Sequence, residues 1–522
     1  MDLNSENRAP RILIIGAGSR GDAYARAVSQ STKGVVVAVA DPIAFKRKEL
    51  GRKYIWADEH PRPEQEFTDW RMFISWEKQR RKDASAGHKT APGVDGVFIC
   101  VLDEQHAEVI SALAPLNLHI LSEKPLATTL EDCLSIYCSL LPKQHQAAPQ
   151  TIFGIGHVLR YSPHNMLLRE LLLEDHVIGE IISIEHTEPV GWWHFAHSYV
   201  RGNWRKESTS APSLLTKSCH DIDFLLWLLC SPAPQSEQPP HLPSYLTSTG
   251  SLKYLKKSRK PIAAGDATNC LSCPIETDCM FSAKKIYVEA RLQQGHTGWP
   301  VKIVNPEIED CYVSLGKAAA VGKLLDTLSE DYNEHAARRE IERRPWFGRC
   351  VWESDNDVCD DQFVTITWED DALSGHEVNA NNLKGRGAKT ATFHMMAYTE
   401  KQCERRGRIY GTKGEIEYDS KTISVYDFAS GRTKTQHPRQ PDGGHGGGDD
   451  GLARQFVAAV DAVKNHGVSV EEAQKTYVGC TLEEIIRSHA MVFAAEDARK
   501  GRKVVDWQEW WQRRVEAELQ RR

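Results

Sequence analysis

The stretch RILIIGAGSRGDAYARAV, residues 11–28, decides the fold of the amino-terminal part of the chain. ILII (12–15) is a short apolar run, which is typical of a strand buried on both faces. The residues DAYARAVSQ that follow predict a helix. Gly16, Gly18 and Gly21 therefore lie on the turn from strand to helix, where a Gly-x-Gly-x-x-Gly pattern binds a dinucleotide.

Each glycine of this turn has its own steric reason. Gly16 permits the tight turn, Gly18 lets a pyrophosphate approach the backbone, and Gly21 lets the helix pack closely on the strand. The free N–H groups at the start of the helix bind the phosphates. The alternative is a surface turn that contains glycines and holds no ligand.

An acidic residue follows at the distance that a dinucleotide site requires. VVVAVAD (35–41) predicts a second buried strand that ends in Asp41, 20 residues beyond Gly21. A carboxylate there accepts hydrogen bonds from the adenosine ribose and repels a 2′-phosphate, which favours NAD over NADP. Arg20 and Arg47 are cations that offset part of this preference.

The next segments repeat the alternation of strand and helix. Polar residues 58–93 predict a helix and a surface insertion, GVFICVL (96–102) a strand, DEQHAEVISALA a helix, and HILSEKP (119–125) another strand. This order predicts an α/β fold with a doubly wound parallel sheet, whose ligand lies at the carboxyl ends of the strands. Glu123 and Lys124 stand at that edge, and we expect the domain to occupy residues 1–130.

Several motifs along most of the chain make it resemble the Gfo/Idh/MocA family of oxidoreductases. They are IIGAGSRG, VAD (39–41), VLDEQHAE (101–108), SEKPLA (122–127), GHVLRYSP (156–163), IGEIISIEH (178–186), KSCHDIDFLLWL (217–228) and RIYGTKGEIEYD (408–419). The resemblance implies a Rossmann domain followed by a second α/β domain over 131–522 with an open, mainly antiparallel sheet. It also implies a homo-oligomer that forms through this sheet.

The resemblance further implies a bound NAD and a hydride transfer at a sugar-like hydroxyl carbon. The residues that it places at the cofactor are Gly16, Gly18, Ser19, Arg20, Gly21, Asp41, Leu102, His106, Glu123 and Lys124. Lys124 then hydrogen-bonds the substrate hydroxyl, and His220 matches the acid/base histidine of the family. The other interpretations are a surface lysine and a histidine satisfied within the core.

One position departs from the family pattern. Many dehydrogenases of this family carry an aspartate four residues before the histidine, where this chain has Thr216. Lys217 lies on roughly the same helix face as His220 and either substitutes in catalysis or binds an anionic group. The usual lysine–aspartate–histidine set therefore does not carry over whole.

The segment HTEPVGWWHFAHSYVRGNWRK (186–206) is rich in rings and cations. Aromatic faces stack on sugars, and arginines bind carboxylates or phosphates. The alternative is a loop that only packs under the sheet. The expected substrate contacts are His194, His197, Arg201 and Trp204, with Arg160 and Tyr161 from the end of a strand.

CLSCPIETDC (270–279) places Cys270, Cys273 and Cys279 at a C-x2-C-x5-C spacing, in an insertion near 255–300. Three thiolates so close can bind a structural zinc, or an iron–sulfur cluster with a fourth ligand from Cys219, Cys311, Cys350 or a histidine. Free thiols in a packed loop and a disulfide are the alternatives.

The carboxy-terminal half predicts further strands and helices. FVTITWE (363–369), KTATFHMMAYT (389–399) and RIYGTKGEIEYD alternate with a period of two, as sheet strands do. We expect PDGGHGGGDDG (441–451) to be a loop before a helix at 452–463, with His445 or Asp449 near the substrate as the alternative. A helix at 482–499 and an amphipathic tail helix that packs on the body or on another subunit complete the domain.

Composition limits the class of protein. A chain of 522 residues, 41% hydrophobic and 26% charged with a net charge of −6, is typical of a soluble globular protein of two domains. We expect neither nucleic acid nor membrane as a partner, and the polar first residues and unpaired cysteines favour a cytoplasmic location.

Three functions are compatible with these residues. The first is an NAD-dependent oxidoreductase acting on the CH–OH group of a sugar, cyclitol or related polyol. The second is an NAD-dependent glycosidase that works by transient oxidation and elimination. The third is an NAD-binding sensor without catalysis.

Overall fold

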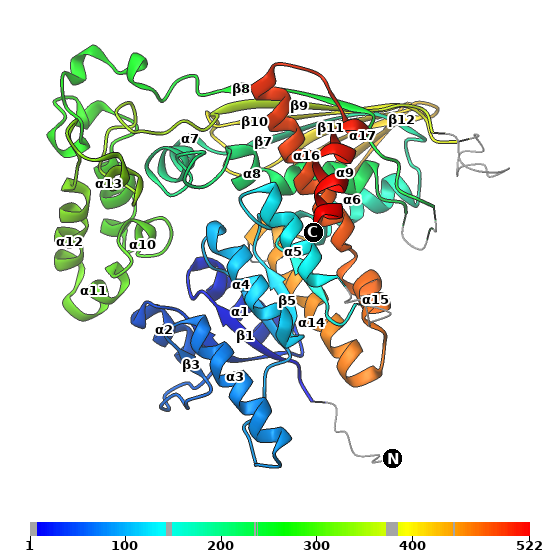
Figure 1. Ribbon diagram of the computed structural model, residues 1–522. Helices are drawn as coiled ribbons and strands as arrows, with labels where there is room; N and C mark the ends of the chain where they lie inside the picture. The colour runs from blue at the N-terminus through cyan, green and yellow to red at the C-terminus, as the bar shows by residue number, and fades with distance from the viewer. Residues whose placement is uncertain (1–7, 142–148, 234–235, 237, 372–384, 442–443) are drawn as a thin grey trace.

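The computed structural model describes residues 8–141, 149–233, 236, 238–371, 385–441 and 444–522. Figure 1 shows two sheets in separate layers, with the strands of the amino-terminal sheet (blue to cyan) below and the larger sheet above. The α/β class predicted from the sequence is confirmed. In the described part of the chain, no helix is both long and apolar enough to cross a membrane.

The first sheet is parallel and has the strand order β3-β2-β1-β4-β5-β6. Its strands are β1 (Arg11–Ile15), β2 (Val35–Ala40), β3 (Glu66–Phe67), β4 (Gly96–Ile99), β5 (His119–Ser122) and β6 (Phe153–Ile155). Its helices are α1 (Ser19–Ser31), α2 (Ala44–Tyr54), α3 (Trp70–Ser85), α4 (His106–Leu113) and α5 (Leu130–Leu140). Because β6 pairs with β5, this sheet extends past residue 130, the boundary expected from the sequence.

The second sheet has the order β14-β13-β12-β11-β7-β10-β9-β8-β15 and is antiparallel except for the pair β7–β10. Its strands are β7 (Ile181–Pro189), β8 (Tyr245–Ser251), β9 (Asp361–Trp368), β10 (Lys389–Met396), β11 (Arg406–Gly411), β12 (Gly414–Tyr418), β13 (Ile423–Asp427), β14 (Arg432–Gln436) and β15 (Val505–Asp506). Burial alternates along β10, where Ala391, Phe393 and Met395 are buried, so one face of the sheet carries the core.

Helices cover that buried face of the second sheet. They are α6 (Pro163–Leu173), α7 (Trp192–Phe195), α8 (Ser213–Thr216), α9 (Cys219–Leu229) and α16 (Leu482–Gly501). Every residue of α9 is buried, because this helix lies between the sheet and α16. Thr481 and Glu484 form a capping box that fixes the start of α16.

The insertion between β8 and β9 is longer than the 255–300 expected from the sequence. It contains α10 (Val301–Val304), α11 (Ile308–Leu315), α12 (Lys317–Ser329) and α13 (Arg338–Glu342). These helices enclose a hydrophobic core of their own, to which Tyr287 and Phe347 contribute. Figure 1 shows the insertion at the left, beside the first sheet and below the second.

Helix α14 (Gly448–His466) returns from the second domain to the first and packs on α1. Its Phe456 packs edge-on against Phe98 of β4, with ring centroids 5.3 Å apart. Phe456 also lies against Gly96 and Gly154, in the space where side chains at those positions would be. The nucleotide-binding sheet is therefore covered in part by a helix from the far end of the chain.

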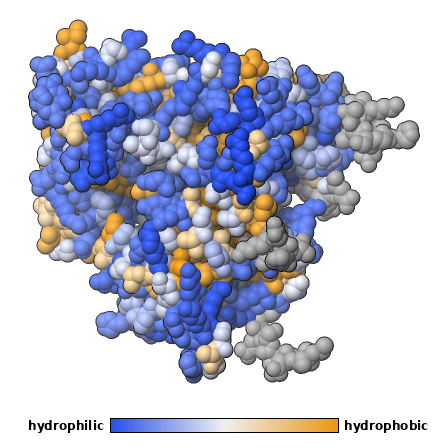
Figure 2. Space-filling view, viewed as in Figure 1, coloured by the Kyte–Doolittle hydropathy of each residue, from blue (hydrophilic) through white to orange (hydrophobic). Residues whose placement is uncertain are grey.

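The end of the chain forms α15 (Val470–Ala473), α17 (Trp507–Trp511) and α18 (Ala517–Arg521), with a π-helical turn between the last two. Trp507 and Trp510 are buried, so the predicted tail helix packs on the body of this same chain. The carboxyl terminus lies near α5 (Figure 1). On the face shown in Figure 2, hydrophilic side chains dominate and hydrophobic ones are scattered.

Candidate active site

A cleft of about 1420 Å³ is lined by residues of both domains. The carboxyl ends of β1, β2, β4 and β5 contribute one wall, as expected for a doubly wound sheet. The segments around β7, α9 and α14 contribute the other. The cleft is therefore the candidate site for a cofactor and a substrate together.

The glycine turn at one end of the cleft has the predicted geometry. Gly16 has a φ of +93°, and a Cβ there would lie 2.4 Å from the carbonyl oxygen of Cys100. A Cβ at Gly21 would lie 1.9 Å from the carbonyl oxygen of Gly16, whereas at Gly18 it would meet nothing within 4 Å. Helix α1 has no side-chain cap, and the buried hydroxyl of Ser19 has no hydrogen-bond partner. Open space before uncapped N–H groups suits a phosphate.

Asp41 lines the cleft at the end of β2. Its Oδ2 accepts from the N–H of Ala17 at 2.7 Å and its Oδ1 from the N–H of Ile43 at 2.8 Å. An ionised carboxylate accepts about four hydrogen bonds, so capacity for ribose hydroxyls is left. Arg47 donates to the carbonyl oxygen of Asp41 and pairs with Glu66, so its guanidinium is already engaged.

Arg20 joins the two domains at the cleft. It donates to Glu123 at 2.6 Å and, through both terminal nitrogens, to Asp449 at 2.8 and 2.9 Å. Burial alone would raise the pKa of Asp449, but Arg20 and His445 hold it well below its ordinary value. Arg20 is thus already paired with two carboxylates, one from each domain.

The loop before α14 contributes to the cleft as well. His445 and Asp449 line it, and the Nδ1 of His445 lies 3.1 Å from the Oδ1 of Asp449. The helix begins at Gly448 rather than at 452. Within the predicted loop 441–451, residues 442 and 443 lie outside the described part of the chain.

Lys124 lies in the turn after β5, on the wall of the cleft. Its Nζ donates to the backbone carbonyl of Thr216 at 2.6 Å, which spans the two domains. Leu102 lines the cleft as well, with 47% of its surface exposed. His106, by contrast, is fully buried with Nδ1 2.7 Å from the carbonyl oxygen of Pro125, and it does not line the cleft. His106 therefore holds the Lys124–Pro125 turn rather than the cofactor.

His220 lies at the start of α9 and faces the cleft. Its Nε2 accepts from Arg405 at 2.7 Å, and its Nδ1 is buried without a hydrogen-bond partner. Burial lowers the pKa of His220 well below its ordinary value, although Asp221 opposes this. The ring is therefore neutral, and because Nε2 is an acceptor, Nδ1 carries the proton.

Lys217 belongs to a buried network beside His220. Its Nζ lies 2.8 Å from Glu188 of β7 and 3.0 Å from the Sγ of Cys403. Burial alone would lower the pKa of Lys217, but Cys403 and Glu188 hold it above its ordinary value. Arg405 lies between two carboxylates. Its Nε is 3.0 Å from the same Glu188 and 2.8 Å from Asp221. The cleft floor thus carries fixed cations whose carboxylate partners lie behind them.

The aromatic segment after β7 forms another part of the wall. His194, His197 and Trp204 line the cleft, and Tyr199 stacks on Trp204 with ring centroids 5.6 Å apart. These residues belong to α7, to the π-helix Ala196–Arg201 and to the turn after it. Burial lowers the pKa of His197 to about 3, so this ring is neutral.

Known proteins give this geometry a context. A family model described as "Oxidoreductase family, NAD-binding Rossmann fold" matches residues 10–147. This part of the chain, residues 10–147, therefore belongs to the Gfo/Idh/MocA family. It is 20% identical over 389 residues to the putative oxidoreductase YteT of Bacillus subtilis (strain 168), covering 72% of this chain and 74% of that protein.

Two further similarities are more limited in scope. The 2,7-anhydro-N-acetylneuraminate hydratase of Escherichia coli (strain K12) is 30% identical over 136 residues, 26% of this chain and 34% of that protein. A solved levoglucosan dehydrogenase in complex with NADH and levoglucosan has a TM-score of 0.56 at 15% identity, with 96% of this chain and 99% of that chain covered. The second similarity is one of fold alone.

Three predicted substrate contacts lie outside the cleft. Arg160 makes two 2.8 Å hydrogen bonds to Asp223, and the hydroxyl of Tyr161 donates to the carbonyl of Val478. Arg201 is buried in the insertion interface, where it donates to the carbonyl of Arg349. These side chains stabilise the second domain, because buried polar groups must find partners inside the protein.

The cysteine segment 270–279 gains a fourth member from the end of the insertion. Cys270, Cys273, Cys279 and Cys350 line one small hollow together with Arg201. Cys219 lies in α9 instead, and Cys311 packs in the core of the insertion without lining the hollow. All 13 cysteines are free thiols, so the disulfide alternative is wrong.

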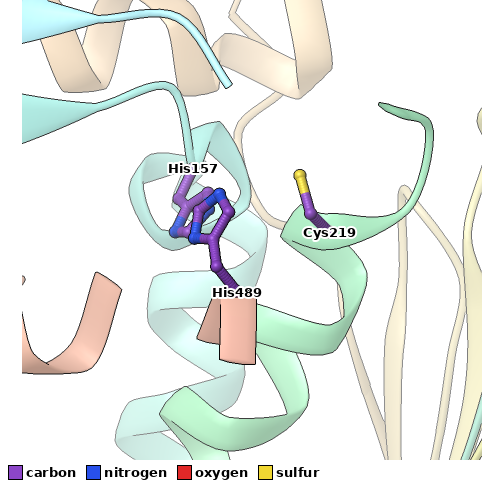
Figure 3. A group of neighbouring side chains, drawn as sticks. All are labelled: His157, Cys219 and His489. Carbon is purple, nitrogen blue, oxygen red and sulfur yellow. The ribbon is translucent and has the colours of Figure 1, made fainter. Parts of the chain in front are cut away.

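Figure 3 shows another buried group, in which His157, Cys219 and His489 have ligand atoms within 4.8 Å of one another. The two imidazoles are stacked in parallel, and the thiol of Cys219 lies apart from them (Figure 3). His489 already accepts from the N–H of Leu126 and donates to the carbonyl of Ile485. The group is therefore part of the hydrogen-bonded core.

Glu188 and Arg405 are the site residues that sequence patterns alone did not reveal. Glu188 is the last residue but one of β7, within HTEP, and Arg405 precedes β11 in ERRGRIYG, so neither lies near Lys217 or His220 in sequence. The one available signal was a charged residue at the end of a buried strand. Only the pairing of β7 with β11 brings the two together.

Proposed function

We propose that this protein is an NAD-dependent oxidoreductase that moves a hydride between a hydroxyl-bearing carbon of a sugar-like substrate and the nicotinamide. One observation carries the proposal. Lys124 from the first domain and His220 from the second line the same cleft as the glycine turn. The charge of Lys124 is close enough to contribute to the lowered pKa of His220.

The residues present fit a dinucleotide. The uncapped start of α1, the open space before Gly18 and the unpartnered hydroxyl of Ser19 would hold the phosphates. Asp41 would hold the adenosine ribose. When bound, NAD accepts or supplies the hydride.

Lys124 is the proposed proton-transfer residue. Its Nζ carries three donor positions, of which Thr216 occupies one, so it can also bind the oxygen of the reacting carbon. In reduction this Nζ donates a proton to that oxygen, and in oxidation it accepts one. His220 keeps Nδ1–H free to bind a neighbouring substrate oxygen, because Arg405 occupies Nε2. The rings of Trp204 and His194 would exclude water and stack on the substrate.

A second candidate reaction is redox-neutral. Transient oxidation makes the adjacent C–H acidic, elimination breaks a C–O bond, water adds, and the hydride returns to the sugar. Lys217 and Arg405, with Thr216 in place of the family's aspartate, favour this route because fixed cations stabilise an enolate. The hydratase among the relatives is consistent with it.

The deciding experiment uses heavy water. The purified protein is incubated with NAD and a panel of free sugars, cyclitols and glycosides, and the products are identified by mass spectrometry. A product lighter by a hydride and a proton, formed in step with NADH, supports the dehydrogenase. A cleaved glycoside that carries solvent deuterium, without net NADH, supports the second route. NAD binding without any turnover would instead support the sensor.

A matched pair of variants tests the role of Lys124. Lys124→Met should lower kcat by about 100-fold or more, since that is the usual contribution of a proton-transfer group, while NAD still binds. Lys421→Met is the control, because Lys421 lines the same cleft with 65% of its side chain exposed. Equal kcat in both variants would remove Lys124 from the reaction.

Association of copies through the open face of the second sheet stays a prediction. Ile182, Tyr245 and Phe363 are exposed there on β7, β8 and β9. Large apolar residues at the surface of a sheet suit a protein interface. Light scattering on the wild type and on Phe363→Glu would test it, with a smaller particle expected for the variant.

A further inference from the structure

Two segments far apart in sequence bring four cysteines around one hollow. Asn269 and Arg349 form an antiparallel bridge, and the N–H groups of Cys270 and Cys350 donate to Gly348 and Thr268, each at 2.8 Å. Cys273 and Cys279 follow Cys270 in a tight loop, in which the N–H of Cys273 donates to the carbonyl of Cys270. The backbone thus holds all four thiols on one side of the insertion.

The hollow between these cysteines is small. It is partly open to solvent. Phe281 and Trp352 supply apolar parts of its wall. Four free thiols that line one hollow are the arrangement of a ligand shell.

Arg201 points to a negative charge in the hollow. This arginine is 1% exposed and lines the hollow, with Nη2 3.2 Å from the Sγ of Cys270 and 2.8 Å from the carbonyl oxygen of Phe281. Its Nη1 is buried without a hydrogen-bond partner. Among the described residues, no carboxylate lies within ion-pair distance of it, and the ionisable groups that act on its charge are Cys270, Tyr287, Cys350 and Cys279.

A buried guanidinium without an anion is costly. Thiols are weak partners while they are protonated, whereas thiolates bound to a metal stay ionised. A centre of four thiolates carries net negative charge, and Arg201 lies where it would balance that charge. A metal centre bound by the four sulfurs would therefore also account for the unpaired charge of Arg201.

The spacing of the sulfurs decides between the metals. A single zinc ion with Zn–S bonds of about 2.3 Å holds its sulfurs about 3.8 Å apart. The group with ligand atoms all within 4.8 Å of one another in the described chain is His157, Cys219 and His489, so the four cysteines are spread more widely. A cluster of several irons holds its thiolates farther apart than one ion does, and C-x2-C runs are frequent among its ligands.

We propose that Cys270, Cys273, Cys279 and Cys350 ligate an iron–sulfur cluster whose negative charge is balanced by Arg201. The cluster ties the insertion to the π-helix Ala196–Arg201, which ends at this arginine and lines the cleft through His197, Ser198 and Tyr199. It therefore braces the cleft wall and takes no part in the hydride transfer. This proposal stands whether or not the proposed reaction is correct.

The test is metal analysis of the full chain. The protein is purified without oxygen and reconstituted with iron and sulfide, then assayed for iron, acid-labile sulfide and visible absorption that bleaches on reduction. About four iron and four sulfide per chain are expected for a cubane cluster. Absence of iron and sulfide in the wild type would overturn the proposal, as would one zinc per chain in their place.

Two serine variants locate the cluster. Cys273→Ser, at a half-buried position, should lose most of the iron and the visible absorption. Cys311→Ser is the matched control, because Cys311 is buried in the same insertion and does not line the hollow. Circular dichroism and NAD binding show that both variants are folded. Equal iron in Cys273→Ser and the wild type would place the metal elsewhere and overturn the assignment.

Discussion

Arg160 carries a residue-scale prediction about stability. Burial alone would raise the pKa of Asp223, but Arg160 and His157 hold it below its ordinary range. Arg160→Met leaves that carboxylate buried without its cation, which should destabilise the fold by about 3–5 kcal/mol. Urea unfolding measures the loss, and KM of the folded variant should stay close to that of the wild type. A large rise in KM at unchanged stability would instead place Arg160 at the substrate.

Asp41 governs the choice between the two dinucleotides. Asp41→Asn keeps one oxygen acceptor for the N–H of Ala17 or Ile43 and removes the negative charge. The ratio of the Kd for NADP to that for NAD should fall by about tenfold, which corresponds to about 1.4 kcal/mol. Titration calorimetry with both dinucleotides measures it. Lys46 also lines this part of the cleft, so Lys46→Met serves as the control that should raise the ratio.

The role of a residue could be predicted from the sequence only where a motif determined both its position in the fold and its chemical function. Gly16, Asp41 and Lys124 lie on the cleft, as the strand ends predicted. Arg160 and Arg201 do not, because an arginine near a strand end satisfies a buried partner as readily as a ligand. Sequence spacing carries no information on which carboxylate or carbonyl lies opposite after folding.

At the scale of elements, the turn from β1 to α1 offers a matched pair of variants. Gly21→Ala places a Cβ 1.9 Å from the carbonyl oxygen of Gly16, so α1 must move away from β1. It should lose about 1–3 kcal/mol of stability as well as NAD binding. Thermal unfolding and NAD titration measure both effects.

Gly18→Ala is the control for that turn. Its Cβ meets no protein atom within 4 Å, and the φ of −72° suits alanine. Stability should stay within about 0.5 kcal/mol, as for substitutions that touch nothing, while NAD affinity falls because the methyl group occupies phosphate space. Equal destabilisation by both substitutions would contradict the steric explanation.

Strands with a clear apolar run or alternation were predicted well, whereas a strand that forms only because it pairs with a neighbouring strand was not. The strands at 12–15, 35–41 and 363–369 were visible because apolar runs and alternation mark them locally. β6, with three residues, has no periodic signal and exists because β5 offers it an edge. The length of the insertion was missed because its helices pack around a core of their own.

The whole molecule should be sensitive to mild acid. Burial lowers the pKa of His119 to about 4 and that of His489 to about 3. Below about pH 6.5 these histidines bind protons in the unfolded chain, whereas in the folded state they stay neutral down to lower pH. Stability should therefore be full above pH 6.5 and fall toward pH 4, by up to about 1.4 kcal/mol per histidine for each pH unit.

Thermal unfolding between pH 7 and pH 5 tests this dependence. His119→Asn is the comparison, because an amide oxygen can replace Nδ1 as the acceptor for the N–H of Ile152 without titrating. Its Tm should fall less on acidification than that of the wild type. An identical loss in both proteins would exclude His119 as a source of the acid sensitivity.

The return of α14 to the first domain bears on how the chain folds during synthesis. Phe456 covers Phe98 and the two glycines of β4 and β6, and Asp449 binds Arg20 beside the glycine turn. All partners of that packing in the first sheet leave the ribosome long before α14 does. The first domain must therefore expose an apolar patch until α14 has been synthesised, and chaperones can bind to that patch. A chain truncated before α14 would keep its whole Gly-x-Gly-x-x-Gly turn. The sheet that positions this turn would nevertheless lack the helix that covers part of its face.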